Sequence, residues 1–107
     1  MQNNFLKNKK IILSAGASGI GLATVKLLLS QGAFVYTCDI DKKNINKLKK
    51  NPYFNKKLFI SECDASKEDE VKKFYKEISY QTKIIDGLIN NIGIAGPTSP
   101  LEKIKSE

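Results

Sequence analysis

The stretch Ser14-Ala15-Gly16-Ala17-Ser18-Gly19-Ile20-Gly21 decides the fold of this chain. The apolar run Ile11-Ile12-Leu13 leads into it, and the helix-like run 22–29 leaves it. A strand, a glycine-rich turn and a helix in this order aim unpaired helix N–H groups at a phosphate. Glycine also lets an anion come close to the backbone, because no Cβ intervenes. A glycine cluster alone is a weak signal, so the rest of the chain has to support this interpretation.

The rest of the chain alternates short apolar segments with amphipathic ones. We predict strands at residues 9–14, 33–38, 57–63 and 84–90. We predict helices that begin at Gly19 and after the capping residues Asp41, Ser66 and Ser99, with Ser66 to Asp69 as a variant of the capping box. Strands that alternate with helices predict an α/β fold in which right-handed crossovers connect parallel strands.

Side-chain spacing indicates which helix faces are buried. The third helix places apolar residues at the spacing i, i+3, i+4, i+7: Val71, Phe74, Tyr75 and Ile78. The first helix has a wide apolar face, which suits packing on a sheet: Ile20, Ala23 and Leu27 on one side, with Val25, Leu28 and Leu29 beside them. We predict that Gly32 stops this helix and that Asn51-Pro52 ends the second.

The net charge of +7 raises nucleic acid as an alternative partner. All 18 basic residues are lysines that are scattered along the chain, and arginine, the preferred residue for bidentate phosphate and base contacts, is missing. We therefore interpret the lysines as solvated helix faces. The basic start followed by residues 11–23 resembles a signal peptide, but glycines and serines interrupt it, and no stretch reaches the length of a membrane span.

Two cysteines, Cys38 and Cys63, each precede a strand-ending aspartate. Without histidine they do not form a zinc site, and the absence of a disulfide framework indicates a reducing compartment, the cytoplasm. If the second and third strands are neighbours, the two thiols lie close together. We expect them to be small buried core side chains, with a redox pair as the alternative.

An acidic residue at the end of the second strand tests the glycine turn. Asp39 lies 18 residues after Gly21, close to the spacing of about 20 that is typical of dinucleotide-binding units. Its carboxylate can accept hydrogen bonds from both ribose hydroxyls of adenosine, and it would repel a 2′-phosphate. The turn, the spacing and the strand order together predict a dinucleotide site.

At this point the chain resembles the short-chain dehydrogenase/reductase family. The family's Thr-Gly-x-x-x-Gly-x-Gly turn matches residues 14–21, with Ser14 for Thr, Ala15 for the first Gly and Gly16 on a variable position. Three further landmarks follow in the family's order: Asp39-Ile40, Asp64-Ala65, and Asn90-Asn91-Ile92-Gly93, in which Ile92 replaces an alanine. The resemblance covers nearly the whole chain.

The resemblance implies a Rossmann-type doubly wound parallel sheet with strand order 3-2-1-4. It also implies the residues that bind the cofactor: Ala15, Gly16, Ser18, Gly19, Ile20, Gly21, Asp39, Ile40, Asp64, Ala65, Asn91 and Gly93. NAD is favoured over NADP, because Ser18 and Ile40 stand where NADP-preferring relatives often carry a basic residue. Lys42 and Lys43 keep NADP open as the alternative.

The resemblance further implies an oxidoreductase that moves a hydride between NAD(H) and a small alcohol or carbonyl substrate, with homo-oligomers formed by the complete chain. The family's catalytic Ser, Tyr-x-x-x-Lys pair and Asn are expected beyond residue 107, so we interpret residues 1–107 as one incomplete Rossmann half-domain without catalytic residues. The literal Tyr53 to Lys57 pattern follows Pro52 in a connection and is not that pair. The alternative is a non-catalytic NAD- or adenosine-binding remnant.

Overall fold

The computed structural model describes residues 5–14 and 19–90, apart from the side chains of Ile20 and Asn90. In chain order the elements are β1 (Lys10–Ser14), α1 (Gly19–Ser30), β2 (Phe34–Asp39), α2 (Lys42–Lys49), β3 (Leu58–Glu62), α3 (Glu68–Ser79) and β4 (Gly87–Asn90). This alternation confirms the predicted one. The helix predicted after Ser99 lies outside the described residues.

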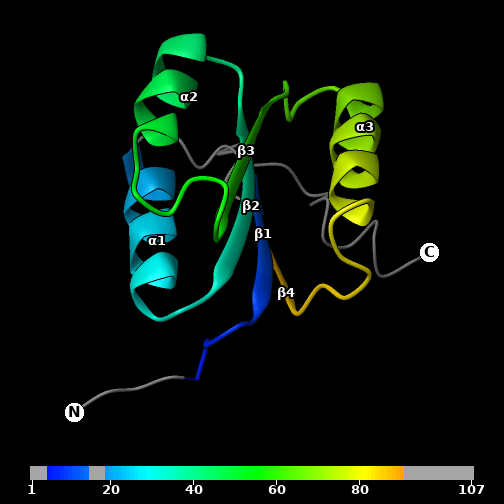
Figure 1. The fold of residues 1–107 in the computed structure, drawn as a ribbon. Helices are drawn as coiled ribbons and strands as arrows, with labels where there is room; N and C mark the ends of the chain where they lie inside the picture. Colours follow the sequence, from blue (N-terminus) through cyan, green and yellow to red (C-terminus); the bar gives the residue numbers. More distant parts are fainter. Residues whose placement is uncertain (1–4, 15–18, 91–107) are drawn as a thin grey trace.

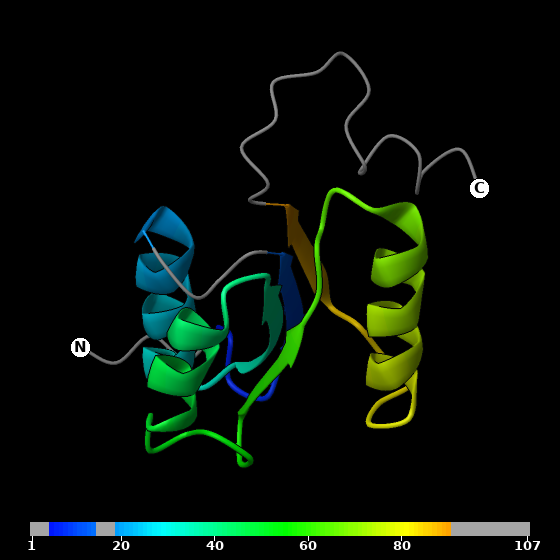
Figure 2. The same cartoon turned by 90° about the horizontal axis from the view of Figure 1, so that it is seen from above.

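The four strands form a parallel sheet in the order β3-β2-β1-β4. Helices α1 and α2 cover one face of this sheet, and α3 covers the other (Figure 1). A view turned by 90° shows the sheet between the two helical layers (Figure 2). The predicted doubly wound sheet and its strand order are therefore confirmed.

Alternate side chains of each strand enter two separate cores, because successive residues of a strand point to opposite faces. Leu13, which is fully buried, packs with Val25, Val35 and Leu58 beneath α1 and α2. The core on the other face joins strand residues to α3: Ile12, Tyr36, Cys38, Cys63, Phe74 and Ile78. Val71 and Tyr75 pack against this second core, as their helical spacing predicts.

The prediction for α1 was wrong for half of its apolar face. Val25, Leu28 and Leu29 are buried, but Leu27 is 57% exposed and Ala23 is exposed. The helix packs on the sheet along a single stripe of its side chains. Residues on the rest of its surface therefore face solvent. Its C-terminal end agrees with the prediction: Gly32 has φ +87° and its N–H donates to the Leu29 carbonyl.

The fourth strand begins three residues later than predicted. Ile84 and Ile85 are 66% and 39% exposed, and β4 starts at Gly87. The reason is the length of its partner: β1 starts at Lys10, whose carbonyl accepts from the Asp86 N–H, so residues 84 and 85 have no β1 residue to pair with. β4 is an edge strand of the described sheet, and its residue Ile89 is 36% exposed.

Candidate functional site

The carboxyl ends of the parallel strands lie together at one end of the sheet, which is the upper end in Figure 1. In the strand register Asp39 lies beside Glu62, and Ser14 lies beside Asn90. The Cys63 N–H donates to the Asp39 carbonyl at 3.0 Å, which brings the start of the β3–α3 connection next to the end of β2. Ligands of open α/β sheets bind outside this end of the sheet. The residues predicted to bind the cofactor that the structure describes lie at this end or in the segments that follow it.

The start of α1 carries a glycine in the left-handed backbone conformation. Gly19, its first residue, has φ +59°, and a Cβ added there would meet no atom of the described chain within 4 Å. The backbone is therefore open on this side, where helix N–H groups lack partners within the helix. Gly21 is buried in the turn of α1 that follows. Five predicted site residues and the side chain of Ile20 lie outside the described part: Ala15, Gly16, Ser18, Asn91 and Gly93.

Asp39 carries a buried carboxylate, 7% exposed, at the end of β2. Its Oδ1 accepts from the Asp41 N–H at 2.8 Å, and the Asp41 Oδ1 in turn accepts from the Lys43 N–H at 2.8 Å. These successive turns fix the Asp39 side chain and confirm Asp41 as the N-cap of α2. The described residues make no hydrogen bond to the Asp39 Oδ2. Ile40, the next predicted site residue, is 62% exposed.

Asp64 occupies the corresponding place after β3. Its Oδ1 accepts from both the N–H and the hydroxyl of Ser66, at 3.0 and 2.6 Å, and these bonds lower the pKa of the carboxyl. Its own N–H donates to the Glu70 Oε1 at 2.7 Å. The neighbouring Ala65 is half-buried, and its N–H donates to no other described residue. A backbone donor and a carboxylate oxygen thus remain side by side at this strand end.

The capping box predicted at residues 66–69 was wrong. The N-cap of α3 is Lys67, which makes no side-chain cap bond, and the Ser66 hydroxyl turns back to Asp64 instead. Glu70, in the first turn of α3, takes the part assigned to Asp69 and reaches back to the Asp64 N–H. A serine prefers the stronger, charged acceptor when an aspartate lies two residues before it.

Two polar residues at this edge were missed by the sequence analysis. Glu70 orders the β3–α3 connection, and the buried Thr37 hydroxyl donates to the Leu13 carbonyl at 2.5 Å, joining β2 to β1 just before the glycine turn. A capping box would pair Glu70 with the N–H of Lys67, which donates to the Asp64 carbonyl instead, so this rule gave no signal for the observed bond. Thr37 carried none, because threonine is common in strands.

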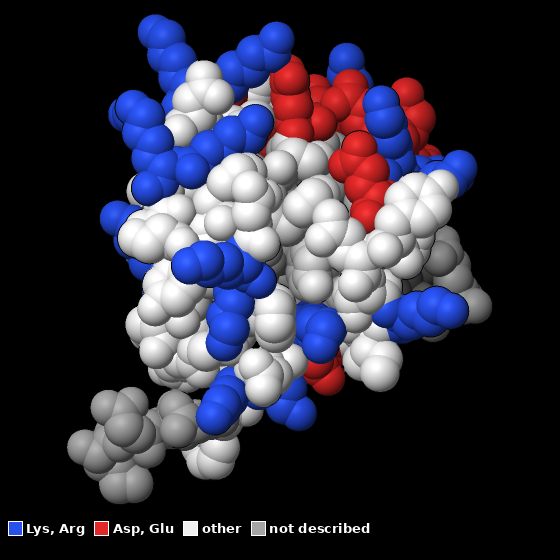
Figure 3. Space-filling view, viewed as in Figure 1, with Lys and Arg blue, Asp and Glu red and all other residues white. Residues whose placement is uncertain are grey.

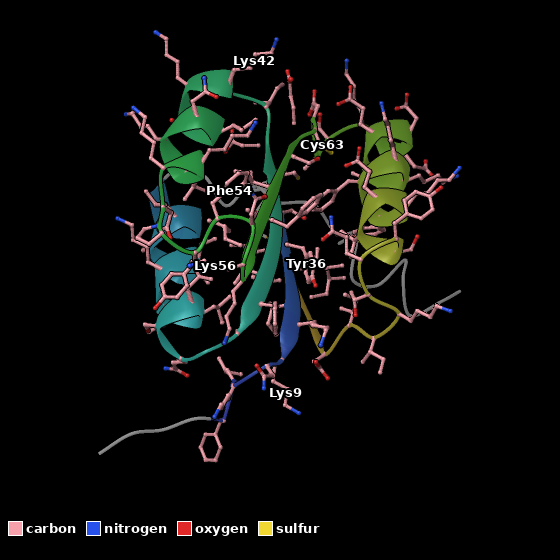
Figure 4. The ribbon with its side chains drawn as sticks, viewed as in Figure 1. Lys9, Tyr36, Lys42, Phe54, Lys56 and Cys63 are labelled. Atoms are coloured by element: carbon pink, nitrogen blue, oxygen red, sulfur yellow. The ribbon has the colours of Figure 1, made fainter. Side chains whose placement is uncertain are left out.

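The two cysteines lie together in the core on the α3 face, as the strand order predicts. Figure 4 shows Cys63 on this face. Both thiols are free and buried. Burial, followed by the charge and hydrogen bond of Cys38, raises the pKa of the Cys63 thiol to about 12. A thiol with this pKa stays protonated at neutral pH and is a poor nucleophile, which favours the interpretation of the pair as core residues.

Tyr53 and Lys57 lie at the opposite end of the sheet. Lys57 immediately precedes β3, and its Nζ donates to the Gly32 carbonyl at 3.2 Å.

The described residues contain no group of three or more acidic, histidine or cysteine side chains that could hold a metal ion. Within the same ranges, no helix has the length and apolar character needed to cross a bilayer.

Comparison with known proteins supports this geometry. Residues 9–107 match the family model of the short chain dehydrogenases. The chain is 40% identical over 92 residues to a sorbitol-6-phosphate 2-dehydrogenase from Klebsiella pneumoniae, covering 86% of this chain and 32% of the relative. It is 32% identical over 109 residues to a tropinone reductase homologue from Arabidopsis thaliana, covering 95% and 40%.

Solved structures show the same fold. A short chain dehydrogenase from Mycobacterium smegmatis superimposes with a TM-score of 0.75 at 23% identity, over 94% of this chain and 42% of that one. The chain thus spans about a third to two fifths of the length of the relatives that it matches.

Proposed function

The chain belongs to the short-chain dehydrogenase family, and we propose that its strand ends and glycine turn hold the adenosine half of NAD(H). Members of this family are oxidoreductases that use NAD(P) and act on small molecules. For the whole protein we propose hydride transfer between NAD(H) and an alcohol or carbonyl compound. Bound NAD(H) would supply the hydride chemistry, and the residues described here bind and orient it.

The observation that carries this proposal is the Asp39 carboxylate. One of its oxygens is held by the Asp41 N–H, and the other accepts no bond from the described residues. A ribose hydroxyl next to the end of β2 can donate to this second oxygen. A buried carboxylate would also repel a 2′-phosphate, because charges in a partly desolvated place interact more strongly than charges in water. We therefore propose NAD rather than NADP.

The other parts of the cofactor are assigned in the same way. The open backbone at Gly19 fits a phosphate at the start of α1. The Asp64 carboxylate and the Ala65 N–H fit the polar edge of adenine, with the exposed Ile40 against its face. The resemblance adds the remaining residues to the proposed site: Ala15, Gly16, Ser18, Ile20, Gly21, Asn91 and Gly93.

We also propose the cytoplasm as the compartment and homo-oligomers as the assembly of the active enzyme. Small alcohols and carbonyl compounds are the proposed substrates, without nucleic acid or membrane as a partner. The lysines of α2 are exposed to solvent, and the residues opposite them on that helix, Ile45 and Leu48, are buried. Such a helix packs on a sheet and keeps its charged face in water.

The test is a titration of the 107-residue chain with NADH and NADPH, followed by the fluorescence of the reduced nicotinamide. We expect wild type to prefer NADH by about tenfold or more, and Asp39→Ala to lose this preference, because an unfavourable charge contact is worth about 1–3 kcal/mol. Glu62→Ala is the matched control. Glu62 is exposed and lies beside Asp39 in the register, so its loss should leave the preference unchanged.

The proposal fails if neither dinucleotide binds. The role of Asp39 fails if Asp39→Ala and wild type discriminate equally between NADH and NADPH.

A further inference from the structure

A cavity of about 420 Å³ opens at the end of the sheet opposite to Asp39 and Asp64. It lies where β1, β2 and β3 begin, on the face that α3 covers, and we call it the amino-end cavity. Its walls include Lys10, Phe34 and Tyr36 from β1 and β2, and Lys57 just before β3. The volume lies within the range of small-molecule sites, about 300–1,000 Å³.

The amino-end cavity is lined by cations and by no acidic residue. The Lys10 and Lys57 ammonium groups lie 5.1 and 5.3 Å from the centre of the Phe34 ring, and Lys56 adds a third positive charge. None of the three lysines forms an ion pair with a described residue, in contrast to Lys72, which pairs with Glu68 on α3. The Asp86 Oδ2 accepts a hydrogen bond from the Lys10 backbone N–H at 2.8 Å, but Asp86 does not line the cavity. Like charges that line one cavity repel each other, and a bound anion lowers this repulsion.

The inner wall of the same cavity is aromatic. The Tyr36 and Phe59 rings lie 6.0 Å apart at 53°, and Tyr36 is 6% exposed. Burial raises the pKa of the Tyr36 hydroxyl, so this group stays protonated and can donate a hydrogen bond. The amides of Asn55 and Gln81 add neutral polar groups to the lining. A cationic rim over an aromatic wall suits a ligand that has an anionic end and a flat apolar body.

We propose that the amino-end cavity binds a small organic anion, a carboxylate carried on a single aromatic ring or a body of similar size. Inorganic phosphate satisfies the lysines but leaves the half-buried Phe34 and Phe59 rings partly in contact with water. A neutral aromatic molecule covers the rings but leaves the lysines without a counter-charge. This site is separate from the cofactor edge, because the two lie at opposite ends of the same strands.

The first test is a titration of the 107-residue chain with benzoate, followed by backbone amide NMR. We expect saturable shifts at Tyr36, Phe59 and Gln81, and weaker binding of both benzyl alcohol and inorganic phosphate. Addition of NADH should leave the benzoate affinity unchanged, because the sites are at opposite ends of the sheet. Equal shifts with benzyl alcohol, or shifts scattered over the whole chain, would overturn the proposal.

Lysine variants provide the second test. Lys10→Gln and Lys57→Gln each remove one charge and keep most of the stem that packs on Phe34, so each should weaken benzoate by about fivefold. Lys9→Gln is the matched control. Lys9 is exposed, lies beside Lys10 at the same end of the sheet (Figure 4) and does not line the cavity. If all three variants weaken benzoate equally, the effect is one of net charge and the proposed site does not exist.

Discussion

The two ends of the sheet carry opposite chemistry. At the carboxyl end, three aspartates each accept a hydrogen bond from the N–H two residues ahead: Asp39, Asp41 and Asp64. At the amino end, lysines gather around Phe34, and Lys57 donates to the Gly32 carbonyl just after α1. In Figure 3 acidic side chains collect at the upper end of the molecule, around the start of α3.

The difference follows from the direction of the helices. The carboxyl ends of β1, β2 and β3 lead into helix N-termini, where N–H groups lack partners within the helix. The amino ends of β2, β3 and β4 follow helix C-termini, where carbonyls lack partners within the helix. Carboxylates suit the first place and ammonium groups the second, which also agrees with the helix dipole. A parallel α/β layout therefore gives each end its own charge preference, whatever ligand binds there.

The largest effect is expected at Gly32, at the amino end. Its φ is +87°, and an added Cβ would lie 3.2 Å from the Lys7 Cα, so Gly32→Ala meets both backbone strain and a contact with main chain. Its carbonyl also accepts from the Asn8 N–H and the Lys57 Nζ. We expect the free energy of unfolding to fall by about 2–3 kcal/mol in a urea titration. A smaller loss of stability in Gly32→Ala than in Gly19→Ala would contradict the packing seen at the amino end of the sheet.

Gly19→Ala makes the same chemical change at the carboxyl end. Gly19 has φ +59° but no neighbour within 4 Å of an added Cβ, so only backbone strain remains, about 1 kcal/mol. The added methyl group would occupy the open space proposed for a phosphate. We therefore expect a small loss of stability together with a clear loss of NADH affinity, whereas Gly32→Ala should lower stability with little direct effect on affinity. Unchanged NADH binding would count against a phosphate at Gly19.

The smallest expected effect is a pH dependence of the stability that Asp64 contributes at the carboxyl end of the sheet. The Ser66 hydrogen bonds hold the pKa of Asp64 below its unfolded value of about 3.9. A carboxyl with a lowered folded pKa contributes stability above its unfolded pKa, and this contribution is lost as pH falls through the folded pKa. Asp64→Asn should therefore be less stable than wild type at pH 7, and the gap should close as the pH falls through the folded pKa of Asp64.

Ser66→Ala separates this bond from other effects of Asp64. It removes the hydroxyl donor and keeps the carboxylate, so it should show part of the same pH-dependent loss. A gap between wild type and Asp64→Asn that stays constant from pH 7 to pH 2 would show that the Ser66 bonds do not set this pKa.

Much of the fold could be predicted from local residues. The strands were found from short apolar runs, the N-cap of α2 from Asp41 and the end of α1 from Gly32, because each signal acts within a few residues. The predictions failed where a distant element decides. The sheet decides which face of α1 is buried, and Leu27 lies on the face that stays exposed. The first residue of β4 depends on where β1 starts. No local pattern contains that information.

The sequence by itself determined the order of strands and helices, the glycines at the start and end of α1, and the aspartates at two neighbouring strand ends. These features rest on backbone conformation and on hydrogen bonds between residues close in the chain. Only the tertiary structure decided that Thr37 bonds the Leu13 carbonyl, and that Lys10 and Lys57 share one aromatic ring. Each of these contacts joins separate strands, and their register is fixed by burial of both faces of the sheet, a property of the whole chain.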